Sequence, residues 1–109
     1  MYLAHPFLAR FVEVLNDGRL GDLKAINGFY CADIWQVTNP MGRGTLYNLG
    51  CYPTSLMHLV VQTMCGEAAF ATRRIHGTGN TSEEDGTIVD AAMSVRFDNG
   101  VLGSLQSTD

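Results

Sequence analysis

The C-terminal part of the chain alternates between apolar and polar residues, and this alternation limits the possible folds more than any other feature. From Ile88 to Phe97 every second side chain, starting with Val89, is apolar. That spacing is typical of a strand in a sheet with one buried and one solvated face. A second run, Val101–Ser107, follows Asn99-Gly100, a pair that favours a two-residue hairpin turn. The sequence therefore predicts an antiparallel hairpin whose apolar face needs a second layer.

Two earlier segments have the three-four spacing of amphipathic helices, which can supply that layer. The first is predicted over residues 6–17, with Pro6 in its first turn and Gly18 at its C-terminal cap. The second is predicted to end at Gly66, and Pro53 leaves two possible starts: a regular helix from about Tyr52, or an earlier turn kinked at the proline. The residues on its apolar side are Leu49, Tyr52, Leu56, Leu59 or Val60, and Thr63.

The remaining segments read as strands and loops. They are a strand Leu23–Ile34, a loop Trp35–Thr45, a strand Ala68–Ile75 and a polar loop Gly77–Gly86 that includes Gly77-Thr78-Gly79 as a turn. Helix, strand, helix and then strands is the order of an α+β fold. We therefore expect a mainly antiparallel open sheet with helices packed on one face.

The composition is that of one packed domain. Hydrophobic residues make up 46% and charged residues 17% of the chain, too apolar for a disordered tail, and 109 residues can hold one core. We therefore treat residues 1–109 as a single domain. The net charge of −4 comes with one lysine and scattered arginines, so nucleic acid is not an expected partner. The longest apolar run, Leu56–Val61, is too short to cross a membrane.

The three cysteines, Cys31, Cys51 and Cys65, are an odd number and have no C-x-x-C or metal-ligand spacing. We interpret them as reduced thiols of a cytoplasmic protein and expect no metal site. The chain runs directly into its first helix, and Gln106–Asp109 stop at a strand that would be a bare sheet edge. That pattern predicts a piece of a larger protein.

The segment most suggestive of chemistry runs from Gly42 to Pro53. Asn48 and Tyr52 are four residues apart, so they share one face if the turn between them is helical. A phenol beside an amide can handle a proton, although a tyrosine pKa near 10 then needs a cationic neighbour. From the residues alone, a tyrosine at helical spacing with leucines is more often a boundary residue of an amphipathic helix. Both interpretations are open at this point.

Three stretches of the chain, taken together, resemble one enzyme family. The matching positions are Gly42, Gly44, Leu46, Gly50 and Tyr52, the segment His5-Pro6 with Gly18–Leu23, and the turn Phe97–Val101. They resemble the C-terminal domain of the glucose-fructose oxidoreductase/inositol dehydrogenase family, in the branch with tyrosine at the active-site helix. In this chain Arg43 stands where the family has a glycine, and Asn48 where it has an aspartate.

The resemblance implies an oxidoreductase acting on a sugar, polyol or related hydroxyl compound, with a fold like the C-terminal domain of glyceraldehyde-3-phosphate dehydrogenase. The family's Rossmann domain, with its G-x-G-x-x-G turn and catalytic lysine, is not in this sequence. NAD or NADP is therefore expected in the full-length protein, and this fragment is expected to bind neither and to be inactive. Tyr52 would relay the substrate proton, and Asn48 would bind a substrate hydroxyl.

Two loop residues are further candidates for substrate binding. Arg43 could contact an anionic substrate or a cofactor phosphate, although solvated loop arginines are commoner. Trp35 could line a sugar-sized pocket, although boundary packing is commoner. We interpret His5 as a helix-entry residue and His58 as a boundary or partner-facing residue.

A non-catalytic binding or dimerisation module is the alternative to an enzyme domain, because a half-covered sheet is a common association surface. In either case we expect a homo-oligomer formed through the sheet face. Phe29, Val89 and Met93 are the apolar side chains expected on that face.

Overall fold

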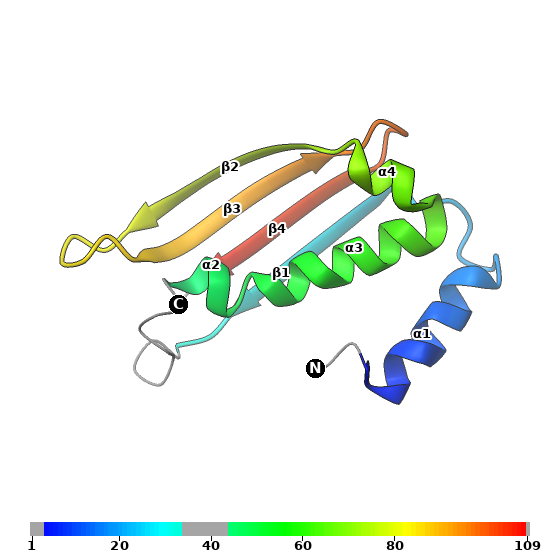
Figure 1. Cartoon of the computed structure of the whole chain (residues 1–109), viewed down its shortest axis with the longest axis horizontal. Coiled ribbons are helices and arrows are strands. Elements are labelled where there is room, and N and C mark those ends of the chain that lie inside the picture. Colours follow the sequence, from blue (N-terminus) through cyan, green and yellow to red (C-terminus); the bar gives the residue numbers. More distant parts are fainter. Residues whose placement is uncertain (1–3, 34–43, 109) are drawn as a thin grey trace.

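The computed structural model describes residues 4–33 and 44–108 as one layer of helices on one sheet (Figure 1). The elements in order are α1 (Pro6–Asn16), β1 (Ala25–Cys31), α2 (Thr45–Asn48), α3 (Cys51–Cys65), α4 (Glu67–Ala71), β2 (Arg74–Thr81), β3 (Ile88–Arg96) and β4 (Leu102–Thr108). Helix α3 packs on β1 and β4, α2 contacts β3 and β4, and α1 packs on α3. The helices lie on one face of the sheet, which confirms the predicted α+β architecture.

The strand order is β1-β4-β3-β2. β2 with β3 and β3 with β4 are antiparallel, whereas β1 and β4 are parallel, with Ala25 opposite Leu102. β4 is therefore paired on both sides, and the expectation that it forms a bare edge is wrong. Within the described residues the outer strands are β1 and β2. The error arose because β4 pairs with a strand far away in the sequence, as Asn27 and Ser104 show, which are 77 residues apart. No local pattern reveals such a pairing.

The core lies between α3 and the middle of the sheet. Val95, Phe97 and Leu105 from the sheet side meet Met57 and Val61 of α3, all of them buried. This confirms the predicted alternation of β3, whose Ser94 and Arg96 are exposed.

The buried side of α3 differs from the prediction. Its buried residues are Pro53, Met57, Val60 and Val61, whereas Tyr52 is 40% exposed and Leu56 only partly buried. Ten of the fifteen residues of this helix are apolar and they lie on more than one side, so the spacing alone did not define one face.

The segment after α3 also differs from the prediction. Residues 68–71 belong to α4, and β2 begins only at Arg74 and continues to Thr81. Gly77-Thr78-Gly79 therefore lies inside a strand, opposite Met93 to Ala91, and the interpretation of it as a turn is wrong. Pairing with β3 supplies the backbone hydrogen bonds and overrides the low strand propensity of glycine. The connecting loop is shorter than predicted, and Ser82 N donates to Thr87 O at 2.7 Å.

The hairpin between β3 and β4 is confirmed, but its turn is longer than predicted. Phe97 N donates to Val101 O at 3.1 Å, and Gly100 N donates to Phe97 O at 3.0 Å. These bonds enclose a three-residue loop, 98–100, with Gly100 at φ +88°. A tight turn followed by a glycine in the left-handed region is the usual form of such a loop.

The two faces of the sheet have different surroundings. Phe29 is 75% exposed on the face that no described helix covers, which we call the open face. Met93 packs against the core, and Val89 shares its alternation, so both belong to the helix side. The prediction that Phe29, Val89 and Met93 share one exposed face is therefore wrong, because only Phe29 lies on the open face. None of the helices in residues 4–33 and 44–108 is long and apolar enough to cross a membrane.

Candidate active site

Gly44 anchors the segment that the sequence singled out. Its φ is +90°, and a Cβ atom there would lie 2.1 Å from the carbonyl oxygen of Ile88. Gly44 forms a bridge with Ile88 at the start of β3. A side chain at this position would thus meet both backbone strain and a direct clash. The glycine fixes where α2 begins relative to the sheet.

The helical hydrogen-bond pattern is interrupted between α2 and α3. Leu49 N and Gly50 N both donate to Thr45 O, at 2.8 and 3.0 Å, and Tyr52 N then donates to Leu49 O at 3.1 Å. A Cβ atom at Gly50 would lie 2.6 Å from the carbonyl oxygen of Leu46, so the break depends on this glycine.

Of the two possible starts, the structure has a new helix from Cys51, with Pro53 in its first turn. Asn48 ends α2 and Tyr52 lies in the first turn of α3, so the continuous helical turn assumed between them is interrupted. Asn48 is half-buried.

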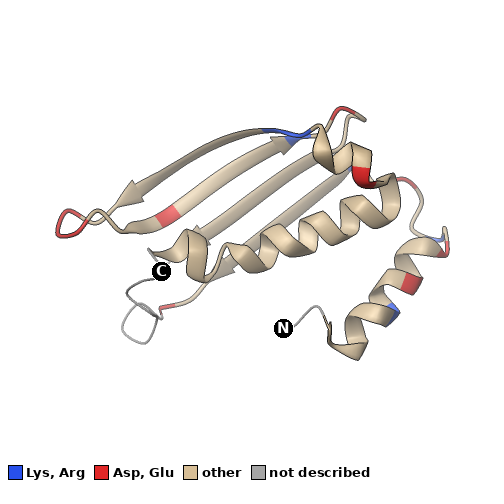
Figure 2. Cartoon of the chain, viewed as in Figure 1, with Lys and Arg blue, Asp and Glu red and all other residues tan. Residues whose placement is uncertain are grey.

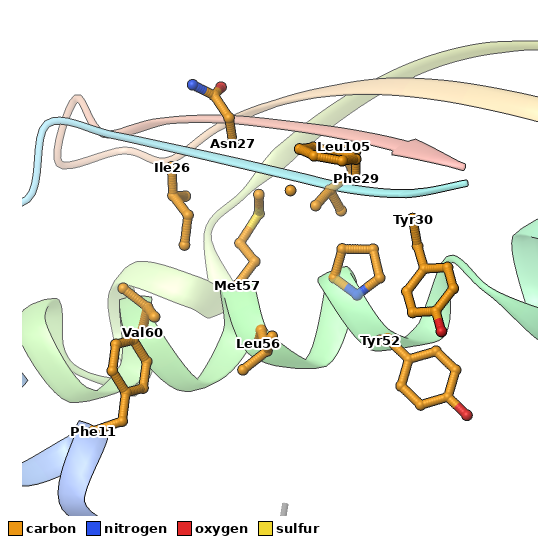
Figure 3. A pocket seen from close by; sticks show the side chains of 12 residues that line it. Phe11, Ile26, Asn27, Phe29, Tyr30, Tyr52, Leu56, Met57, Val60 and Leu105 are labelled. Carbon is orange, nitrogen blue, oxygen red and sulfur yellow. The ribbon is translucent and has the colours of Figure 1, made fainter. Parts of the chain in front are cut away.

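Helix α3 approaches β1 closely at its N-terminal end. A Cβ atom at Gly28 would lie 2.9 Å from Cβ of Pro53 and 3.0 Å from Cδ2 of Leu105. The missing side chain lets Pro53 pack directly on the strand, and this brings Tyr52 beside Tyr30. The two rings stack with centroids 5.3 Å apart and planes 28° apart (Figure 3).

A groove of about 500 Å³ lies next to these two rings. Its lining residues are Phe11, Ile26, Asn27, Gly28, Phe29, Tyr30, Tyr52, Pro53, Leu56, Met57, Val60 and Leu105. The Asn27 side chain points to the other side of the sheet, where its Oδ1 accepts from Ser104 Oγ at 2.6 Å. The side chains turned into this groove are therefore apolar, and the polar groups at its margin are the phenols of Tyr30 and Tyr52.

Sequence reasoning assigned no role to Tyr30, although a signal was present. The alternation in β1 already placed Tyr30 on the same side as Ile26, which packs against the core. The alternation could not show which residue of α3 would stack on Tyr30.

Two of the three histidines, His5 and His58, have structural partners. His5 is the N-cap of α1, and its Nδ1 accepts from Phe7 N at 3.1 Å, which confirms the helix-entry interpretation. His58 stacks on Phe70 at 3.9 Å, and its Nε2 lies 3.4 Å from a Glu67 carboxylate oxygen. His58 is thus a boundary residue.

Among the described residues, no charged side chain lines this groove. Arg43 and Trp35 lie outside the described residues. In the described part of the chain, no group of three or more histidine, cysteine, aspartate or glutamate side chains is arranged to bind a metal ion. Asp85 lies in the distant loop at the end of the β2–β3 hairpin. There the backbone N–H and hydroxyl of Thr87 hold the pKa of its carboxyl below the usual value.

Residues 8–109 match the family model of the GFO/IDH/MocA C-terminal domain. The chain belongs to this family. The resemblance of the glycine pattern is therefore confirmed, and so is the assignment to the domain that follows the family's Rossmann domain. The structure adds a physical reason for two of the family's glycines, because Gly44 and Gly50 both stand where a Cβ atom would clash with the backbone.

Two solved structures have the same fold as this chain. One is KijD10, a 3-ketoreductase from Actinomadura kijaniata in complex with TDP-benzene and NADP, with TM-score 0.72 and 18% identity. Another is an inositol dehydrogenase homolog from Azotobacter vinelandii complexed with NAD+, with TM-score 0.69 and 13% identity. Each comparison covers 98% of this chain but only 30% of the solved chain. Among curated proteins no match to this chain is found.

Proposed function

We propose that this chain is the substrate-side domain of an NAD(P)-dependent oxidoreductase acting on a hydroxyl group of a sugar, polyol or related compound. One observation carries the proposal: the family's glycine pattern presents Tyr52, 40% exposed, in the first turn of α3. The solved relatives hold NADP or NAD+, which supports a nicotinamide cofactor. The chain spans 30% of their length, so a Rossmann domain would complete the enzyme.

The described residues do not themselves form a dinucleotide site. Their nearest glycine pair, Gly77 and Gly79, lies within β2 and not in a turn between a strand and a helix. The cofactor would therefore be held by the other domain, and the isolated chain would be inactive. When bound there, the nicotinamide supplies or accepts the hydride.

The proposed work of this domain is proton transfer and substrate binding. Tyr52 would accept the proton of the substrate hydroxyl during oxidation and return it during reduction. A phenol with a pKa near 10 needs a cation to do so near neutral pH, and the lysine of the family's nucleotide domain would provide it. The Asn48 amide would bind another substrate hydroxyl, Arg43 an anionic group, and Trp35 would form part of the wall.

The test is Tyr52→Phe in the complete enzyme, which removes one hydroxyl and almost no volume. We expect kcat to fall about a hundredfold to ten-thousandfold, with a smaller change in KM and a nearly unchanged melting temperature. Tyr47→Phe is the matched control, because Tyr47 is an exposed tyrosine on the neighbouring helix α2. A boundary role for Tyr52 predicts the reverse: a stability change of about 1 kcal/mol and an unchanged kcat.

The open face supports a second role, self-association. Phe29 is 75% exposed there. On the β2–β3 hairpin Arg74 and Arg96 lie opposite each other at one end, where Arg74 also pairs with Asp98 at 3.7 Å. An acidic loop, residues 83–85, lies at the other end (Figure 2). A second copy stacked with its strands reversed would place its acidic loop on this basic end, which favours specific pairing. If no activity were found, the same face would make the chain a non-catalytic dimerisation module.

We also propose a cytoplasmic location, on the ground that Cys31, Cys51 and Cys65 are all free thiols.

A further inference from the structure

The stacked pair of Tyr30 and Tyr52 joins a rigid strand to the first turn of a helix. Tyr30 lies in β1, paired with Ser107 of β4, so hydrogen-bonded backbone holds it in place. Tyr52 lies next to the break between α2 and α3, where its backbone N–H donates to Leu49 O at 3.1 Å. Tyr30 is 41% and Tyr52 40% exposed, so each ring has one open side and the stack covers part of the other.

The stack limits where the Tyr52 hydroxyl can go. The ring centroids are 5.3 Å apart and the planes differ by 28°, an arrangement that aromatic pairs favour. Any large rotation of the Tyr52 side chain would separate the two rings. Figure 3 shows both hydroxyl groups turned to the same side, away from the apolar groove. The Tyr30 ring thus selects one orientation of the neighbouring phenol.

The approach that creates this pair is built into the backbone. Pro53 packs on Gly28 where a Cβ atom would lie only 2.9 Å away. Tyr30 is two residues after Gly28 in β1 and therefore lies on the same face of the strand. Tyr52 immediately precedes Pro53 in α3. The contact of glycine and proline therefore brings the two tyrosines together.

We infer that Tyr30 is a positioning residue, whose ring holds the Tyr52 hydroxyl in the orientation required for proton transfer. This inference rests on the catalytic role proposed for Tyr52. Proton transfer needs heavy atoms within about 2.6–3.2 Å, and a misplacement of about 1 Å can cost on the order of a hundredfold in rate. A residue that acts only through orientation should affect kcat and leave substrate binding largely unchanged.

The experiment compares Tyr30→Leu and Tyr30→Phe in the complete enzyme. Leucine removes the ring, so we expect kcat to fall about tenfold to a hundredfold with KM within about threefold. Phenylalanine keeps the ring and should restore kcat to within about threefold of the parent enzyme. In a Tyr52→Phe background, Tyr30→Leu should lower kcat no further, because no hydroxyl remains to be oriented.

Phe7→Leu is the matched control, since Phe7 is an exposed ring stacked on Phe11, at 6.4 Å, in another part of the molecule. It should leave kcat unchanged. A full-speed Tyr30→Leu enzyme would overturn the inference, as would a Tyr30→Phe enzyme as slow as Tyr30→Leu, because the hydroxyl and not the ring would then matter. If Tyr52→Phe slows the enzyme but Tyr30→Leu does not, the positioning role fails alone. If Tyr52→Phe retains full activity, both the catalytic role of Tyr52 and the positioning role of Tyr30 are refuted.

Discussion

Replacing Gly28 with alanine tests the contact that places α3 on the sheet. The added methyl carbon would lie 2.9 Å from Cβ of Pro53 and 3.0 Å from Cδ2 of Leu105. Carbon atoms pack best at about 3.5–4.0 Å, so helix and strand must separate by roughly 0.5–1 Å. Such overpacking typically costs about 1–3 kcal/mol, whereas alanine regains roughly 0.5–1 kcal/mol through its lower chain entropy. The expected net result is a loss of up to about 2 kcal/mol.

The assay is urea unfolding of the parent and Gly28→Ala proteins, combined with kcat of the complete enzyme. Gly77→Ala is the matched control, because Gly77 is also a strand glycine but its added methyl would meet mainly the Met93 side chain, at 3.2 Å. We expect Gly77→Ala to be close to neutral and Gly28→Ala to lower both stability and kcat. A Gly28→Ala protein more stable than the parent, with an unchanged kcat, would refute the idea that this glycine sets the distance between α3 and β1.

Two further predictions concern binding. The isolated chain should show no binding of NAD(H) or NADP(H) by calorimetry, because its sequence lacks the G-x-G-x-x-G pattern that receives the pyrophosphate of a dinucleotide. Low-micromolar binding would contradict this prediction. Phe29→Ser should weaken self-association in sedimentation experiments at high micromolar concentration, whereas Phe7→Ser, on the helix layer, should not. A parent protein that stays monomeric under these conditions would refute the open face as an association surface.

Some elements could be read from the sequence because local chemistry decides them. The helix α1 follows from Pro6 in its first turn, apolar side chains at three-four spacing, and Gly18, whose φ is +80°. The alternation in β3 indicated correctly that Ala91 and Val95 are buried, because neighbouring strand side chains point to opposite faces, whereas Val89 near the start of the strand is 37% exposed. The glycine pattern around Tyr52 identified the family, since Gly44 and Gly50 stand where backbone contacts exclude a side chain.

Other features were decided only by the tertiary structure. The parallel pairing of β1 with β4 brings Asn27 to Ser104, and no pattern within either strand contains that choice. The orientation of α3 was equally hidden, because a helix with ten apolar residues among fifteen has more than one side that it could bury. Shape selected one: Pro53 fits on the bare backbone of Gly28, and this contact turns Tyr52 outward against Tyr30. The sequence therefore determined which residues are available to the site, and packing between distant segments determined which of them meet.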